Sequence, residues 1–321
     1  MLSSSACSDL NRAFNHSVGV SSLETERDYS DVQVIRLISN SKFPVFLAYS
    51  RQANEYLVMK SYPFHNGEIN PSYLHECRFL NLNHPNIVSM VFSVDATQAL
   101  YKGKMVDLSY ILMELAFCDF TDMLELNDFA KDVKLGRTYF LQLIEGLEYL
   151  HENGISHLDI KLENLLLGRD YKLKLSDFDL SYVKGDRKFR GKGTIQFRAP
   201  EFFSSEHFDP SKADIYSAGI ILFAFTCGYL PYDEGGPING HDLQRLMFEE
   251  PEAFWEVHST FKSEKVTLSK PFKDLFMSMV KKDPKARISL KEIKKSKWCQ
   301  GPVYNQEELS LLKKKDHLVK K

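Results

Sequence analysis

The chain has 321 residues, of which 43% are hydrophobic, and its formal net charge is −2. This length and composition allow one large or two modest domains with a real core. The near-neutral charge argues against nucleic acid as the main partner, because phosphate backbones are bound by basic surfaces. Five cysteines without paired spacing argue against disulfides and zinc sites. The longest apolar run, 218–230, is too short to span a bilayer. We therefore expect a cytoplasmic or nuclear protein without a membrane span.

The N-terminal third predicts mainly strands. Residues 1–30 are polar and serine-rich, which is typical of a flexible tail. Beyond them, short runs of β-branched and aromatic residues alternate with turn formers. The expected strands cover 32–38, 45–49, 56–60, 87–94 and 109–114. One helix is expected at 71–82, and its apolar face would carry Tyr73, Leu74, Cys77 and Leu80.

From about residue 116 the pattern becomes helical. A stripe of apolar residues predicts a helix over 135–151, which Asn153 and Gly154 would end. Further helices are expected at 214–227, 241–250, 270–281 and 289–295. Strands followed by helices indicate an α+β fold of two lobes, 31–115 and 116–300. Residues 301–321 would then form a basic C-terminal tail.

Three polar motifs carry the chemistry. They are the run His157-Leu158-Asp159-Ile160-Lys161-Leu162-Glu163-Asn164, the triplet Asp177-Phe178-Asp179, and the triplet Ala199-Pro200-Glu201. A loop carboxylate can take a proton from a hydroxyl, and a nearby lysine can offset charge on a moving phosphoryl group. One amide and a second acid suffice to hold Mg²⁺ between phosphates. These groups together are the minimum for phosphoryl transfer, in which positioning and charge neutralisation supply most of the catalysis.

The order and spacing of these motifs resemble the signature of the eukaryotic protein kinase family, serine/threonine type. The general shape of the C-terminal part is similar to the calcium/calmodulin-dependent and AMP-activated branch. The resemblance covers about residues 31–300 and implies the two-lobed protein kinase fold, with a small β-rich N-lobe and a larger helical C-lobe. It also implies ATP and Mg²⁺ as cofactors and Ser/Thr hydroxyls of proteins as acceptors.

The resemblance assigns four catalytic residues, which are Asp159, Lys161, Asn164 and Thr194. Asp159 would orient the substrate hydroxyl, and Lys161 would contact the transferring phosphoryl group. Thr194 would steady Asp159 and Lys161. Asn164 and Asp177 would hold magnesium. The side chains of Leu80, Met90, His157 and Phe178 resemble the hydrophobic spine of the family, anchored at Asp214.

The resemblance also assigns nucleotide contacts to Ile38, Phe46, Lys60, Glu76, Met113, Glu114, Ala116 and Leu166. Lys60 would pair with Glu76, provided that the loop before the helix is one residue shorter than usual. His75 is the alternative without a gap, but it carries the wrong charge. The spacing leaves open whether Val45 or Phe46 lies over the adenine. In the C-lobe, Arg287 is expected to pair with Glu201.

The chain departs from the family pattern in three places. The loop 38–46, which covers the phosphates, has no glycine and carries Pro44, so we expect it to be stiffer and to bind ATP less tightly. Asp179 replaces a glycine, which restricts the turn. Leu158 replaces an arginine that pairs with a phosphate in many kinases, and 183–193 contains no Ser, Thr or Tyr. A phosphate switch needs both an acceptor and a cation, so activity should not require phosphorylation there.

Two other functions are compatible with the fold. A pseudokinase scaffold would fit the missing glycines, and a small-molecule kinase would fit the same core motifs. The Ala-Pro-Glu triplet favours protein substrates. Asp119 and Glu163 indicate a preference for basic flanking residues, although Ala224 stands where some relatives place a further acid. The basic segment 307–321 is compatible with binding calmodulin or acidic lipid, but such segments are more often a solvated last helix.

Overall fold

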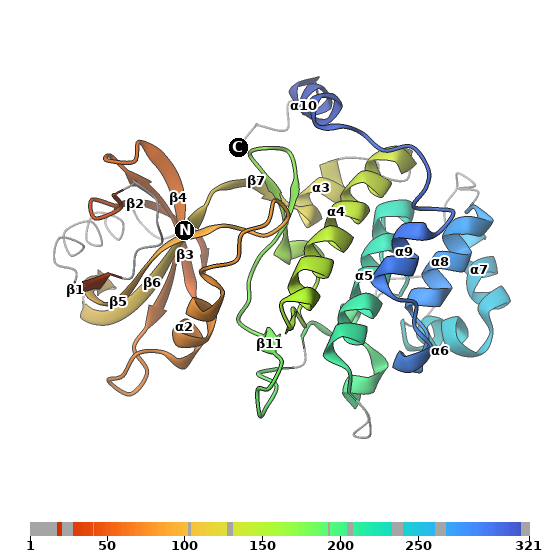
Figure 1. Ribbon diagram of the computed structural model, residues 1–321, viewed down its shortest axis with the longest axis horizontal. Coiled ribbons are helices and arrows are strands. Elements are labelled where there is room, and N and C mark those ends of the chain that lie inside the picture. Colours follow the sequence, from red (N-terminus) through yellow and green to blue (C-terminus); the bar gives the residue numbers. More distant parts are fainter. Residues whose placement is uncertain are drawn as a thin grey trace. The chain divides into compact units, whose positions relative to one another are not determined.

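A computed structural model describes residues 18–20, 28–40, 42–101, 104–126, 131–191, 193–203, 208–232, 240–260 and 268–315. Most of the expected N-terminal tail, Ser41 of the phosphate loop and residues 316–321 lie outside this description. The chain divides into two compact units, Met1–Ala116 and Phe117–Lys321 (Figure 1). The first is built on a sheet and the second on helices, which confirms the α+β prediction. No helix in the described residues is long and apolar enough to cross a membrane.

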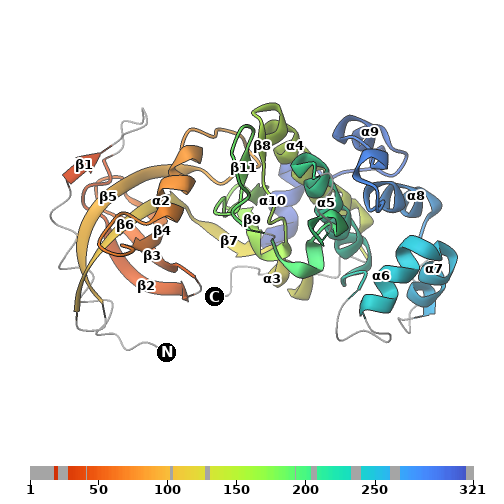
Figure 2. The same ribbon diagram turned by 90° about the horizontal axis from the view of Figure 1, so that it is seen from below.

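Within its described residues, the first unit is a six-stranded sheet with one short α-helix. Its strands are β1 (Val18–Val20), β2 (Gln33–Asn40), β3 (Pro44–Ser50), β4 (Glu55–Pro63), β5 (Met90–Tyr101) and β6 (Lys104–Glu114). They pair antiparallel in the order β1-β5-β6-β4-β3-β2, with β1 at the edge beside β5 (Figure 2). Helix α2 (Pro71–Glu76) runs into a 3₁₀ turn, η1 (Cys77–Phe79).

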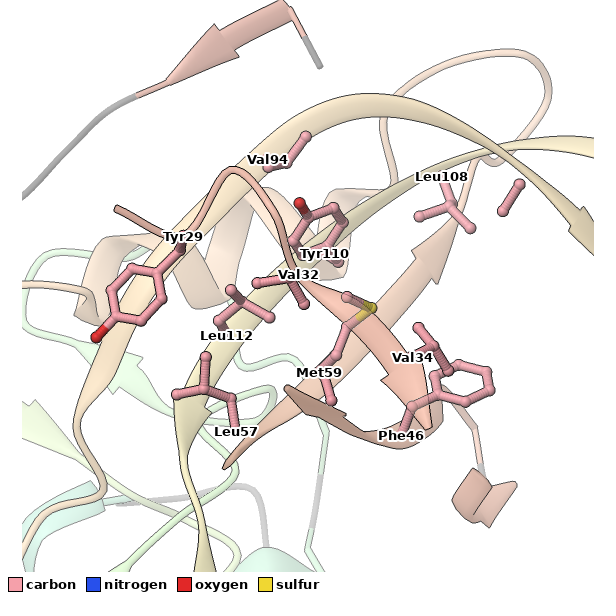
Figure 3. Packing of buried hydrophobic residues seen from close by; sticks show 12 residues of the cluster. Tyr29, Val32, Val34, Phe46, Leu57, Met59, Val94, Leu108, Tyr110 and Leu112 are labelled. Carbon is pink, nitrogen blue, oxygen red and sulfur yellow. The ribbon is translucent and has the colours of Figure 1, made fainter. Parts of the chain in front are cut away.

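Alternation along the strands gives the sheet one apolar face. Near the middle of β3 and β4, alternate residues enter a buried cluster that includes Phe46, Leu57 and Met59 (Figure 3). Successive side chains of a strand point to opposite faces, so the residues between them lie on the other face. Lys60 is one of these, and the packing of the core therefore decides on which face this lysine lies.

Three expectations for this unit need correction. The predicted helix 71–82 is α-helical only to Glu76, and Leu74 lies outside its buried face with 54% of its surface exposed. The N-terminal segment is not all tail, because Val18–Val20 pairs with β5 and Tyr29 is buried. The hairpin of β5 and β6 is longer than the predicted strands 87–94 and 109–114.

The helices of the second unit within the described residues are α3 (Phe120–Leu126), α4 (Val133–Glu152), α5 (Pro210–Cys227), α6 (Gly240–Glu249), α7 (Pro251–Thr260), α8 (Lys270–Met279), α9 (Leu290–Lys295) and α10 (Gln306–Lys315). Helices α4 and α5 pack side by side at its centre (Figure 1). The side chain of Asp209 caps the first turn of α5, and Gly228 ends the helix with φ 75°. Every residue from Ala213 to Cys227 is buried.

Short strands and turns complete the unit. Strands β7 (Ala116–Asp119), β9 (Leu165–Gly168) and β10 (Leu173–Leu175) form one small sheet, and β8 (Ile155–Ser156) pairs with β11 (Tyr182–Val183). The 3₁₀ turns are η2 (Leu162–Asn164), η3 (Ile195–Phe197), η4 (Pro200–Phe203) and η5 (Pro284–Ala286). Helices α3 and α7 were not predicted.

Helix α10 corrects the expectation of a C-terminal tail. Leu309 is 1% exposed, Glu308 pairs with Lys134 at 3.0 Å, and the Tyr304 hydroxyl donates to Asp132. These contacts fix the start of the helix on α4. The apolar Leu309 that calmodulin or a lipid surface would contact is therefore already packed against the unit.

The predicted pair of Arg287 and Glu201 is present and buried, with two nitrogen–oxygen distances of 2.6 Å. We expect Arg287→Leu to lower the free energy of unfolding by roughly 3–5 kcal/mol, because it leaves a buried carboxylate without its cation. Urea denaturation measures this. Lys270→Ala is the matched control, since the pair of Lys270 with Asp274 is exposed and should contribute less than about 1 kcal/mol. Equal losses would contradict the prediction.

His258 of α7 is buried among the rings of Phe223 and Phe254. Burial lowers its pKa to about 4 from an ordinary value of 6.5. Folding favours the neutral imidazole, because its pKa is lower in the folded protein than in the unfolded chain. The free energy of unfolding is therefore unaffected by this group above pH 6.5, and it decreases as the pH falls toward 4. We expect His258→Phe to make the decrease in the free energy of unfolding between pH 7 and pH 4 smaller by about 3 kcal/mol. Urea denaturation at pH 7 and pH 4 tests it, and an unchanged pH dependence in the variant would contradict it.

Candidate active site

The predicted lysine–glutamate pair lies within the first unit. Lys60 near the centre of β4 is 7% exposed, and its ammonium lies 2.7 Å from a carboxylate oxygen of Glu76 at the end of α2. The Tyr62 hydroxyl donates to the same oxygen at 2.5 Å. Tyr62 lies two residues after Lys60 and therefore on the same face of the strand. Glu76 is thus held by two donors, and His75, the alternative partner, instead contacts Arg78.

The sheet register corrects one predicted nucleotide contact. Val45 lies opposite Lys60 on β3 and β4, whereas Phe46 lies opposite Met59. Phe46 is 5% exposed and belongs to the core cluster with Met59. Because neighbouring residues of a strand point to opposite faces, Phe46 cannot share the face of Lys60. Val45, the alternative that the spacing left open, is the residue that does.

Four further predicted nucleotide contacts lie on strands. Ile38 is 45% exposed on β2, and Met113 is buried on β6 opposite Val58. Glu114 ends β6; its carboxylate accepts from the Ser89 amide at 2.7 Å, and its own amide donates to the Ser89 carbonyl. Ala116 begins β7.

The fifth, Leu166, lies in the second unit. It is half-buried on β9, which pairs with β7. The residue lies opposite Lys174 in the β9–β10 ladder.

The backbone of the loop 157–164, the catalytic loop, is fixed by one buried acid. The carboxylate of Asp214 on α5 accepts from the amides of His157 and Leu158, each at 2.8 Å. It also lies 2.9 Å from the His151 ring at the end of α4. Leu158 has φ 63°, a left-handed conformation that bulky residues rarely adopt. These two hydrogen bonds from backbone amides hold the turn and orient the next residue, Asp159.

Asp159 is the centre of a hydrogen-bonded group that joins all four predicted catalytic residues. The hydroxyl and the amide of Thr194 donate to one carboxylate oxygen at 3.0 and 2.9 Å. Lys161 lies 3.1 Å from the other oxygen and also donates to the Thr194 hydroxyl. The Asn164 amide group donates to the carbonyl and to the carboxylate of Asp159. The carboxylate is therefore oriented from three sides.

A glycine brings the chain beyond 190 close to this carboxylate. Gly193 has φ 69°, and a Cβ there would lie 2.5 Å from the carbonyl oxygen of Leu158. Any other residue would push Thr194 away from Asp159. A small pocket lies beside them, lined among others by Leu158, Asp159, Gly193, Thr194, Arg198 and Phe202.

The two predicted magnesium ligands are brought together by the backbone. The amide and the hydroxyl of Ser176 both donate to the carbonyl of Asn164 at 3.0 Å, so Asp177 follows next to Asn164. The side-chain nitrogen of Asn164 donates to Asp159, so the side-chain oxygen is the atom of Asn164 that can bind a metal ion. One carboxylate and one amide oxygen fit Mg²⁺, which favours hard oxygen ligands and few protein groups. The described residues contain no cluster of three or more His, Cys, Asp or Glu suited to another metal.

Residues 41–299 match the model of the protein kinase domain family. The chain belongs to the protein kinase family. This confirms the predicted recognition, and the β-sheet unit and the helical unit are the two lobes of the kinase fold.

Relatives of this kinase chain are protein kinases by name, and one of them is named a serine/threonine protein kinase. CBL-interacting protein kinase 11 of Oryza sativa subsp. japonica is 35% identical over 233 residues, which cover 69% of this chain and 41% of the relative. Serine/threonine protein kinase OSK3 of Oryza sativa subsp. indica is 31% identical over 242 residues, covering 73% and 42%. The carbon catabolite-derepressing protein kinase of Secale cereale is 32% identical over 227 residues, covering 70% and 40%. The kinase chain therefore spans about two fifths of the length of these relatives.

The two acids expected to contact basic residues of the substrate, Asp119 and Glu163, differ in how exposed their carboxylates are. The Asp119 carboxylate accepts from the amides of Thr121 and Asp122 at 2.9 and 3.0 Å. Burial raises the pKa of Asp119, and the neighbouring charges of Asp122 and Glu163 add to this effect. Glu163 is exposed on η2. Of the two acids, Glu163 is thus the one turned to solvent.

Sequence reasoning missed two contacts around Lys60. Tyr62 carries a signal that could have been used, because it follows Lys60 by two residues on a strand. Phe43 carries none: its ring lies 4.7 Å from the Tyr62 ring and 5.9 Å from the Lys60 ammonium. This burial of Phe43 depends on how the glycine-free turn between β2 and β3 closes.

Tyr62→Phe tests whether the second donor to Glu76 matters for nucleotide binding. We expect ATP to bind about tenfold more weakly, because a hydrogen bond to a charged group contributes about 1.5–3 kcal/mol and holds Glu76 in reach of Lys60. Titration calorimetry with Mg-ATP measures this. Tyr49→Phe is the control, since it removes a hydroxyl bonded to Asn54 at the surface. Equal affinities of the two variants would refute the role of Tyr62.

Proposed function

We propose that this chain is an ATP-dependent serine/threonine protein kinase that transfers the γ-phosphoryl group to protein hydroxyls. The observation that carries the proposal is the orientation of the Asp159 carboxylate by Thr194, Lys161 and Asn164. A carboxylate fixed in this way within a loop is suited to accept the proton of a substrate hydroxyl. A scaffold without activity would have no use for four polar side chains engaged with one another.

Each residue of the site has one task in this proposal. Asp159 orients the attacking hydroxyl and receives its proton. Lys161, within reach of both Asp159 and Thr194, offsets negative charge on the transferring group. Lys60, held by Glu76, binds phosphate oxygens of the nucleotide. Bound by Asp177 and Asn164, Mg²⁺ would neutralise charge between the phosphates.

We further propose that the substrates carry basic residues near the target Ser or Thr. Glu163 supports this, because it is exposed and lies one residue before Asn164 in the catalytic loop. Asp119 contributes less, since its carboxylate caps α3. A cytoplasmic or nuclear location fits the four described cysteines, which are all free thiols.

Phosphate transfer from ATP to a basic Ser/Thr peptide tests the activity. We expect Asp159→Asn to lower kcat by about 10²–10⁴, because it removes the general base, and Asp177→Asn to abolish the response to magnesium. Asp274→Asn, an exposed aspartate of α8, serves as the control. Activity of the Asp159 variant equal to that of the control would refute the proposal.

Glu163→Gln tests the substrate class separately. We expect it to raise KM for a basic peptide several-fold and to leave KM for a neutral peptide unchanged, because only the charged partner is lost. Glu252→Gln, at the exposed start of α7, is the matched control. A parallel change for both peptides would count against charge recognition.

A further inference from the structure

The third residue of the Asp-Phe-Asp triplet is a buried acid. Asp179 is 6% exposed, and an ionised carboxylate in such a place is costly unless a cation pairs with it. Arg190 supplies the cation from eleven residues further along the chain. Its Nε donates to the Asp179 carbonyl at 2.8 Å, and a terminal nitrogen lies 3.4 Å from the Asp179 carboxylate. The acid that replaces glycine and this arginine therefore belong together.

The stretch between these two residues is held by rings as well. Phe189, next to Arg190, lies 4.8 Å from the Tyr182 ring and 4.4 Å from the Phe208 ring. Phe208 in turn lies 4.4 Å from Phe202 on η4. Aromatic pairs at such distances attract one another beyond the burial of their area. The chain that follows Asp179 is thus attached to both β11 and η4.

Two hydroxyls that border this stretch, those of Ser181 and Thr194, are engaged in internal bonds. Ser181 is buried and donates to the carbonyl of His157, and Thr194 donates to Asp159. Leu158, where many kinases carry a phosphate-binding arginine, is 5% exposed. A regulatory phosphate at Ser181 or Thr194 would therefore have to break an internal bond, and it would not find the usual cation at position 158.

We propose that Arg190 is a positioning residue that does the work of such a phosphate. Its double contact with Asp179 fixes the end of the turn that carries Asp177. The turn is already held at its centre, because the Phe178 carbonyl accepts from the Ser181 amide at 3.0 Å and the Phe178 ring packs on His157. With Arg190 added, the turn and the following stretch keep one arrangement without modification. This inference rests on the proposed kinase function.

A purely structural pair would behave differently. The side chain of Arg190 is 29% exposed, so its loss lets water reach the Asp179 carboxylate and should cost less stability than the loss of the fully buried Arg287. A positioning role predicts instead a large change in catalysis and in the response to magnesium. The two readings therefore separate when stability and kinetics are measured on the same variants.

The test compares Arg190→Ala with Arg187→Ala, an exposed arginine three residues earlier in the same basic stretch. In the full chain, treated with phosphatase, we expect Arg190→Ala to lower kcat about ten- to a hundredfold, the scale of a small misplacement of catalytic groups. The Mg²⁺ concentration for half-maximal activity should rise several-fold. Arg187→Ala should match the wild type, and Arg190→Lys should recover part of the loss.

A double-mutant cycle assigns the effect to the pair. Asp179→Gly and Arg190→Ala should each lower kcat, and the double variant should be no worse than Arg190→Ala alone, because Arg190→Ala already removes the side-chain contact that Asp179→Gly removes. Additive losses would overturn the proposal. So would equal kinetics of Arg190→Ala and Arg187→Ala, a wild type that loses activity with phosphatase, or a loss explained wholly by a lower melting temperature.

The outcome remains readable if the kinase function itself is wrong. Thermal shift with Mg²⁺ and a non-hydrolysable ATP analogue reports the turn without any transfer reaction. A wild type that binds the Mg-nucleotide but phosphorylates no peptide refutes the activity, while a smaller shift in Arg190→Ala still supports the positioning role. An identical shift in both proteins refutes the positioning role alone.

Discussion

The chemistry of this protein depends on the buried carboxylate of Asp214. It accepts hydrogen bonds from the backbone amides of His157 and Leu158 and thereby holds Leu158 in a left-handed conformation. Without these two bonds the loop would relax, because such a conformation is unfavourable for a bulky residue. The direction of Asp159, and with it the bonds to Lys161 and Thr194, follows from this turn. One acid in the most buried helix of the unit thus sets the geometry of a site in a loop.

In the first unit the same task falls to a sheet. The alternation of β4 places Met59 in the core and Lys60 on the other face, so the lysine is aimed by packing rather than by its own contacts. Glu76 then forms an ion pair with Lys60 and accepts a hydrogen bond from the Tyr62 hydroxyl. A charge buried in this way is stabilised only while its partners are in place. The pairing therefore couples the end of α2 to the register of the sheet.

The departures from the kinase pattern are each accommodated within their own unit. Asp179, in place of a glycine, is matched by Arg190, and Leu158, in place of an arginine, fills a buried position. In the glycine-free phosphate loop, Phe43 packs against Tyr62. Each change that introduces charge or bulk is accompanied by a neighbour that accommodates it. Such accommodation is what the proposed active arrangement requires.

The sequence by itself determined the family, the two-lobed α+β fold, most helices and the residues of the catalytic loop, because these follow from short-range motifs and from hydrophobic periodicity. It also determined the pairs of Lys60 with Glu76 and Arg287 with Glu201. Only the tertiary structure decided that Val45 rather than Phe46 shares the face of Lys60, since a shift of one residue reverses every side chain of a strand. It alone joined Arg190 to Asp179 and helix α10 to α4. Contacts between residues far apart in the chain depend on how whole elements pack, and no local pattern records that packing.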